Sequence, residues 1–227
     1  QHRLATLALS AGDPPRAFEV LEELLVAEPG HEGALSLLER MMKAGESGSS
    51  PARILDAAYA ATGRHDKRQA TLFALIRHSE LSEEKRAYAL SLAQLEEREL
   101  DSPRDALESY GLALHESGLD GDTIADMVRV ADRAAAYPRL AEIRAVELES
   151  VRPESSESAA LCHEVAGYFE RSELPDEAIE HYRRAYTFDP AAGEKSLLGL
   201  LAICENQGRF DELCEWLQVA ADNAEDD

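Results

Sequence analysis

Three cysteines and a neighbouring histidine are the side chains in this sequence best suited to nucleophilic or metal chemistry. Cys162 directly precedes His163. Adjacent residues of a helix point about 100° apart, so this pair cannot converge on one metal ion or act together as nucleophile and base. Cys204 and Cys214 are ten residues apart, which does not match the ligand spacing of a zinc site. We therefore predict three small buried thiols, an exposed His163 and no metal site.

Acidic pairs are the other candidates for chemistry, because two carboxylates can divide the work of a general acid and a general base. Examples are Glu83-Glu84, Glu96-Glu97 and Asp226-Asp227. We interpret all of them as solvated helix faces or tail residues. The sequence contains no glycine-rich phosphate loop, no Cys-x2-Cys pair and no His-Glu-x2-His motif. We predict a protein that is not an enzyme and needs no cofactor.

The charge balance limits the classes of partner. The chain carries 45 acidic and 23 basic residues, which gives a net charge of −22. A nucleic-acid backbone or an anionic membrane surface would be repelled, so we expect neither as a partner. No apolar run of about 18 residues is present, so we expect no membrane insertion. Two interpretations of the acids stay open: they keep a long surface hydrated, or they attract a basic protein segment.

Composition and proline placement favour an all-α chain. Aromatic residues make up only 6% of the sequence, whereas Ala, Leu, Glu and Arg, which have high helix propensity, are abundant. The prolines either open an expected helix, where a missing N–H costs least, or follow one. The openers are Pro14, Pro15, Pro51, Pro103, Pro138 and Pro175, and the followers are Pro29, Pro153 and Pro190. No proline interrupts an apolar helical pattern.

One stretch, Cys162 to Pro190, has the spacing of a known repeat unit. It reads Cys162-x2-Val165-Ala166-x2-Phe169, then Ala178-x3-Tyr182, Ala185 and Pro190. The second part recurs as Ala106, Tyr110 and Ala113, and with leucine in place of tyrosine as Ala17, Leu21 and Leu24. This pattern resembles the tetratricopeptide repeat (TPR) family, whose unit is a helix–turn–helix of about 34 residues.

The resemblance implies an all-α fold, a right-handed α-α superhelix or TPR-like solenoid of about 12–13 antiparallel helices. We expect one repeat domain over residues 1–227, as a segment of a longer protein. The match is poorest over residues 31–80, where the alternation of first and second helices slips. A domain boundary near residues 45–50, at a Gly/Ser-rich stretch, is the alternative.

The resemblance also implies a binding groove, because first helices of successive TPR hairpins line a concave surface that holds a partner segment. Transferred position by position, the groove would be lined by Arg129, Asp132, Arg133, His163, Gly167, Glu170, Arg171, Lys195, Leu198, Ala202, Glu205 and Asn206. The alternative is that these are merely exposed helix residues. Members that clamp a partner's terminal carboxylates carry Lys and Asn where this chain has His163 and Gly167. That specificity is therefore not expected here.

We predict a non-catalytic scaffold whose groove binds a basic or mixed-charge segment of another protein. One alternative is the sensory or regulatory repeat region of a larger enzyme or signalling protein whose catalytic domain lies outside this segment. Another is self-association through a convex face or uncapped ends. The odd number of cysteines without a framework spacing favours a reducing compartment, and no leader peptide is visible, so we expect a cytoplasmic location.

Overall fold

A computed structural model describes residues 1–45, 48–117, 120–149, 155–190 and 193–225. These residues form 13 α-helices and one 3-10 helix and contain no strand, which confirms the all-α prediction and its helix number. The helices are α1 His2–Ser10, α2 Pro14–Ala27, α3 Glu32–Ala44, α4 Ser50–Thr62, α5 His65–His78, α6 Ser82–Arg98, α7 Pro103–Ser117, α8 Gly121–Ala134, α9 Tyr137–Val146, η1 Glu147–Glu149, α10 Ser156–Arg171, α11 Pro175–Phe188, α12 Glu194–Asn206 and α13 Phe210–Glu225. None of these described helices combines the length and the apolar character that crossing a bilayer requires.

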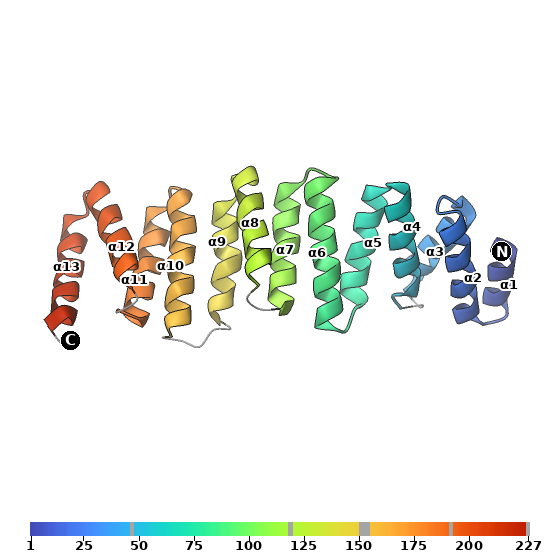
Figure 1. Cartoon of the computed structure of the whole chain (residues 1–227), viewed down its shortest axis with the longest axis horizontal. Helices are drawn as coiled ribbons and strands as arrows, with labels where there is room; N and C mark the ends of the chain where they lie inside the picture. Colours follow the sequence, from blue (N-terminus) through green and yellow to red (C-terminus); the bar gives the residue numbers. More distant parts are fainter. Residues whose placement is uncertain (46–47, 118–119, 150–154, 191–192, 226–227) are drawn as a thin grey trace. The chain divides into compact units, whose positions relative to one another are not determined.

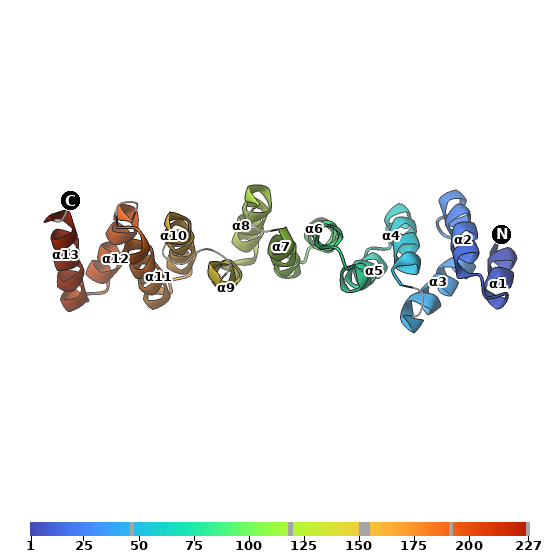
Figure 2. The same cartoon turned by 90° about the horizontal axis from the view of Figure 1, so that it is seen from below.

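The chain divides into two compact units, Gln1–Asp126 and Met127–Asp227, and the division falls within α8. Inside each unit, neighbouring helices along the chain lie side by side and alternate in direction (Figures 1 and 2). The expected alternative boundary near residues 45–50 includes 46–47, which lie outside the described residues. On either side of it, α3 and α4 pack against each other within the first unit. One domain over residues 1–227 stays a prediction.

The first unit is held together by leucine-rich helix faces. One core cluster joins α1 to α4 and contains Leu21, Leu38 and Leu55, each fully buried. A second cluster joins α4, α5 and α6 through Leu72, Leu75 and other buried side chains. Full burial of one such side chain contributes about 1.5–3 kcal/mol. The helix register that the sequence left open over residues 31–80 is therefore set by α4, which packs against α2, α3 and α5.

The residues of the repeat signature are packing residues. Tyr110 is fully buried and Tyr182 is 5% exposed. The alanines on either side of each tyrosine, such as Ala106 and Ala178, are fully buried. Small side chains at these places let the two helices of a hairpin approach closely, and α6 with α7 and α10 with α11 are such pairs.

Local sequence signals end and begin the helices. Asp13 caps α2, because its side chain accepts a hydrogen bond from the backbone N–H of Arg16 at 3.2 Å. Gly45 ends α3 in the left-handed conformation that glycine adopts without strain. Ser155 and Ser158 cap α10 reciprocally, each side chain accepting the other's backbone N–H. The charged and aromatic side chains of α10 are thereby fixed in register.

Two interpretations from the sequence are wrong. Glu96 and Glu97 are buried rather than solvated: Glu96 has no exposed surface and accepts hydrogen bonds from Gln69 and Ser109. Glu97 accepts a hydrogen bond from Tyr110 at 3.2 Å. Cys214 is exposed, although Cys162 and Cys204 are buried as predicted. The pair Asp226-Asp227 lies outside the described residues.

Candidate protein-interaction surface

The residues predicted to line a groove lie on α8, α10 and α12, in the part of the chain from Met127 onward. Most are exposed: Arg129, Asp132, Arg133, Glu170, Arg171, Lys195, Leu198, Ala202, Glu205 and Asn206. His163, which was expected to be exposed, is half-buried, and Gly167 is partly buried. We call the exposed set together with His163 the α8–α10–α12 surface.

Tyr137, at the first position of α9, connects two of the three helices of this surface. Its hydroxyl donates a hydrogen bond to Asp132 of α8 at 3.3 Å and accepts one from Arg171 of α10 at 3.2 Å. The guanidinium of Arg171 also lies over the Tyr137 ring, 5.2 Å from its centroid, in a cation–π contact. An acid and a base from two helices are thereby held beside one aromatic ring.

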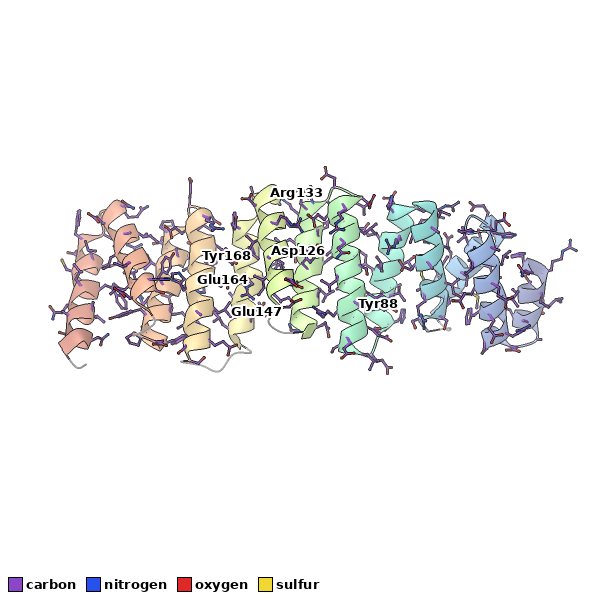
Figure 3. All side chains as sticks on the ribbon, viewed as in Figure 1. Tyr88, Asp126, Arg133, Glu147, Glu164 and Tyr168 are labelled. Atoms are coloured by element: carbon purple, nitrogen blue, oxygen red, sulfur yellow. The ribbon has the colours of Figure 1, made fainter. Side chains whose placement is uncertain are left out.

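Behind Tyr137, a buried arginine ties α9 to α10. Tyr137 stacks on Tyr168, with ring centroids 6.1 Å apart, and the Tyr168 hydroxyl donates to Glu164 at 2.5 Å. Glu164 also accepts two hydrogen bonds from Arg144, whose side chain is only 2% exposed. Figure 3 labels Glu164, Tyr168 and Glu147, the second carboxylate that pairs with Arg144.

Burial and charge pairing oppose each other in this network. Burial acts to lower the pKa of Arg144, but hydrogen bonds and charge attraction from Glu164 and Glu147 outweigh it and raise the pKa. Burial raises the pKa of Glu147, against the nearby guanidinium of Arg144. Burial and the hydrogen bond to Glu164 both raise the pKa of Tyr168, so this hydroxyl stays a donor at neutral pH.

Tyr182 positions the next two members of the surface. Its hydroxyl donates to Glu170 at 2.8 Å, and its ring packs at a tilt against His163, with centroids 5.4 Å apart. His163 Nδ1 lies 2.9 Å from the Ser196 hydroxyl of α12. Burial and the positive charge of Lys195 lower the pKa of His163, which favours a neutral imidazole. α10 and α12 therefore meet at His163 and Ser196, and the charge of Lys195 acts on the same imidazole.

A glycine lets α12 approach α11 at this point. A Cβ atom added to Gly199 would lie 2.9 Å from the Tyr182 ring, closer than side chains tolerate. Glu205 and Asn206 stand at the far end of α12, where the helix stops. The surface thus consists of a connected part around Tyr137 and Tyr182 and a separate exposed end of α12.

The side chains with reactive potential do not converge. Burial raises the pKa of the Cys162 thiol, and the imidazole of the adjacent His163 is engaged with Ser196 instead. Among the described residues, no three His, Cys, Asp or Glu side chains are grouped as metal ligands. What this surface offers chemically is a set of exposed charges of both signs, several of them anchored by aromatic hydroxyls.

Four residues of this site were missed by the sequence prediction: Tyr137, Arg144, Glu164 and Tyr168. Arg144 occupies the place that tyrosine holds in the repeats at Tyr110 and Tyr182, which is a signal that it is buried and needs a counter-charge. Glu164 and Tyr168 are four residues apart on α10, so they share a helix face. Tyr137 carried no such signal, because it opens a helix after a short turn.

No protein-family model and no curated protein matches this sequence. Several solved structures are similar to it at low identity. MamA protein is 13% identical, with 78% of this chain and 92% of that chain covered and a TM-score of 0.40. YrrB, described as a TPR protein with an unusual peptide-binding site, is 14% identical, with coverages of 77% and 86% and a TM-score of 0.39. The TPR2AB-domain:pHSP90-complex of yeast Sti1 is 11% identical, with coverages of 92% and 90% and a TM-score of 0.38.

Proposed function

We propose that this chain is a non-catalytic scaffold whose α8–α10–α12 surface binds a segment of another protein that carries basic as well as acidic side chains. The observation that carries the proposal is the anchoring of exposed charges by aromatic hydroxyls. Asp132 and Arg171 are both held by Tyr137, and Glu170 is held by Tyr182. Charges held in place lose less conformational freedom when a partner binds, so such a surface favours specific recognition.

The distribution of charge supports a partner of mixed charge. Each of the three helices presents both signs to solvent, with Arg129 and Asp132 on α8, Glu170 and Arg171 on α10, and Lys195 and Glu205 on α12. A purely acidic segment would meet three carboxylates on this surface. The excess of acids over the whole chain favours basic residues in the partner and speeds their encounter through long-range attraction.

The test is affinity capture with the purified chain, identification of the bound protein, and titration of its binding segment against variants. Arg171→Ala, Lys195→Ala and Glu205→Ala should each weaken binding, by about threefold to tenfold for an interface charge. The matched control is Arg139→Ala, because Arg139 is an exposed arginine of α9 that pairs with Glu142, outside the surface. Equal affinity of all three surface variants and the control would refute the assignment.

Two further features belong to the same proposal. We place the protein in a reducing, cytoplasmic compartment, which the odd number of cysteines favours. We propose that neither nucleic acid nor a membrane is its main partner, because the net charge of −22 opposes both. Self-association stays a competing hypothesis, and sedimentation at several protein concentrations separates it from binding to a different protein.

A further inference from the structure

A groove of about 710 Å³ lies between α3 and α5, in the unit that does not contain the α8–α10–α12 surface. Both helices lie on the same side of α4 (Figure 2). The groove is lined by Met42 of α3, by Phe73 and Ile76 of α5 and by two alanines of α5. We call it the α3–α5 groove.

Phe73 is the most unusual residue of this groove. Phe73 is 52% exposed, whereas its neighbours Leu72 and Leu75 are fully buried. Leu72 and Leu75 fill the core between α4 and α6, and Phe73 points away from it. A half-exposed aromatic ring presents apolar surface to solvent, and a partner can bury that surface.

The rim of the groove is basic in a strongly acidic chain. Lys43 and Arg77 line the groove together with His78. Neither Lys43 nor Arg77 has a carboxylate within 4.0 Å anywhere in the described part of the chain, although acids outnumber bases almost two to one.

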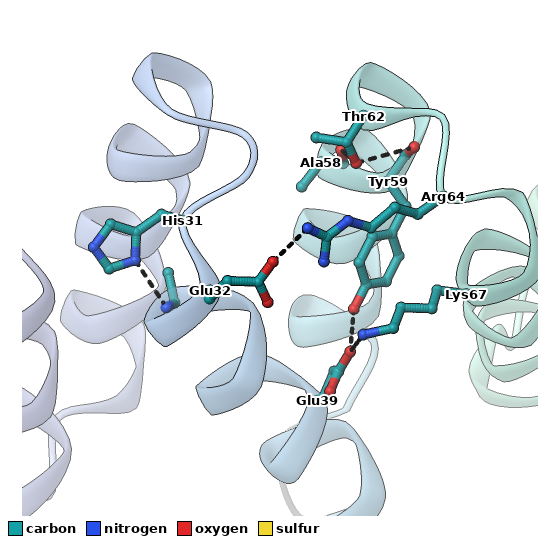
Figure 4. A network of polar contacts seen from close by, with 9 residues as sticks. His31, Glu32, Glu39, Ala58, Tyr59, Thr62, Arg64 and Lys67 are labelled. Atoms are coloured by element: carbon teal, nitrogen blue, oxygen red, sulfur yellow. Dashed lines mark hydrogen bonds and ion pairs between the residues drawn. The ribbon is translucent and has the colours of Figure 1, made fainter.

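Several other basic residues of the same unit are paired. Lys67 contacts Glu39 at 2.7 Å and Arg64 pairs with Glu32, as Figure 4 shows, and Arg68 pairs with Asp56 at 2.9 Å. Glu39, the acid nearest to Lys43 along α3, is thus engaged with Lys67 and Tyr59. The charge of Lys43 still acts on Glu39, but neither Lys43 nor Arg77 contacts a carboxylate within the described residues, so each can contact one that a partner supplies.

We infer that the α3–α5 groove is a second docking site, which binds an acidic amphipathic segment of another protein. The net charge of −22 repels such a segment at long range, so the attraction comes from the short-range contacts with the apolar lining, Lys43 and Arg77. The apolar residues of the partner segment would pack against Phe73 and Met42, and its carboxylates would pair with Lys43 and Arg77. This chemistry is distinct from that of the α8–α10–α12 surface, which presents acids and bases in similar number. The inference does not depend on that surface binding anything.

The spacing on α5 fits a helical occupant. Ala70, Phe73, Ala74 and Arg77 recur at intervals of three and four residues, so they form a stripe along two turns of the helix. That stripe is about 11 Å long at 1.5 Å per residue. Its two alanines leave low points where the large side chains of a second amphipathic helix can enter.

The test uses three synthetic peptides and the full chain. The probe is a fluorescent twelve-residue peptide with Leu, Phe and Leu at spacings of three and four and Glu or Asp elsewhere. The first comparison peptide replaces every acid with Lys, and the second replaces the three apolar residues with Ser. Fluorescence anisotropy at physiological salt should detect binding of the acidic amphipathic peptide to the chain and no binding of either comparison peptide.

Variants assign the binding to the groove. Phe73→Ala and Arg77→Glu should each weaken binding of the probe about tenfold, from lost apolar contact and from charge reversal respectively. Leu112→Ala and Arg53→Glu are matched controls, because both residues are exposed in the same unit and neither lines the groove. Circular dichroism of each variant establishes that it is folded.

Several outcomes would overturn the inference. One is a dissociation constant for the probe above about 1 mM. Another is equal affinity for the Lys peptide and the acidic probe. A third is a loss of probe binding in the control variants as large as in the groove variants. Groove-dependent binding to phosphatidylserine vesicles but not to the probe would also overturn it. Arg171→Ala should leave probe binding unchanged, so failure here is separable from failure of the α8–α10–α12 surface.

Discussion

Arg144 of α9 and Glu164 of α10 are joined by two hydrogen bonds, Nε to Oε1 at 3.3 Å and Nη2 to Oε2 at 3.0 Å. Arg144 is almost fully buried and Glu164 is about one-third exposed, so the pair connects the interior to the rim of the helix pair. Glu147 supplies a second carboxylate to the same guanidinium. Because a buried charge without a partner is costly, this pair holds α9 and α10 in one register.

Arg144→Met should lower the free energy of unfolding by about 2–4 kcal/mol, because it leaves Glu147, whose side chain is 18% exposed, without its counter-charge. Glu164→Gln should cost about 1 kcal/mol, since Arg144 keeps Glu147. Urea denaturation monitored by circular dichroism measures both. The control Arg139→Met breaks an exposed pair with Glu142 and should leave the midpoint unchanged. A midpoint for Arg144→Met equal to that of the control would contradict the assignment.

Glu96 makes stability depend on pH. Burial raises the pKa of this carboxyl, although hydrogen bonds from Ser109 and Gln69 oppose the shift. The folded chain therefore holds the proton more tightly than the unfolded chain does. The contribution of this group to stability is fully present below the unfolded value near 4.5 and is lost as pH rises through the higher folded value.

Glu96→Gln should accordingly raise the free energy of unfolding at neutral pH and flatten its decline above pH 4.5. The amide keeps the shape of the protonated carboxyl and can hydrogen-bond both neighbours. The measurement is a series of urea titrations from pH 4.5 to neutrality. Glu83→Gln, an exposed substitution on the same helix, should leave the slope with pH as in the wild type. If the free energy of unfolding of Glu96→Gln changes with pH as steeply as that of the wild type, Glu96 is ionised over this whole pH range and the prediction is wrong.

The fold could be predicted from the sequence because packing positions repeat. Alanines at fixed distances from a tyrosine identify the buried face of Ala106–Ala113 and of Ala178–Ala185 without knowledge of the neighbours. The burial of Glu96 also had a signal: it follows Ala89 and Leu92 at intervals of three and four on the buried stripe of α6. The charge of Glu96 by itself predicts a solvated side chain. Its burial is tolerable only because hydrogen-bond donors on α5 and α7 satisfy the carboxylate.

The candidate sites were less predictable, because they depend on contacts between helices far apart in the sequence. Arg171 and Tyr137 are 34 residues apart, and nothing in either segment indicates that they meet. Phe73 fits the apolar pattern of its helix, and its exposure results from the neighbours that Leu72 and Leu75 acquire. Cys214 is exposed because α13 packs on α12 with only part of its surface.

Tyr137→Phe should separate anchoring from packing on the α8–α10–α12 surface. It removes the hydroxyl shared by Asp132 and Arg171 and keeps the ring that stacks on Tyr168. Affinity for the captured partner segment should fall about threefold to fivefold, because two charges regain freedom, while the unfolding midpoint stays close to that of wild type. Tyr88→Phe is the control, since Tyr88 lies on α6 in the first unit. Equal affinity of the Tyr137→Phe and Tyr88→Phe variants for the partner segment would show that the Tyr137 hydroxyl does not anchor the surface charges for binding.

The contact between α11 and α12 requires a glycine at position 199. A methyl group there would lie 2.9 Å from the Tyr182 ring, which is itself hydrogen-bonded to Glu170 and so cannot move away freely. Gly199→Ala should therefore lower the free energy of unfolding by about 1–3 kcal/mol and disturb the contact of His163 with Ser196. Gly167→Ala on α10 is the matched control, because its added methyl group meets no atom within 4 Å. There the higher helix propensity of alanine should stabilise the chain by up to about 1 kcal/mol. Urea denaturation of the two variants side by side measures the difference, and a gain in stability for both would show that α12 can shift away from Tyr182 without cost.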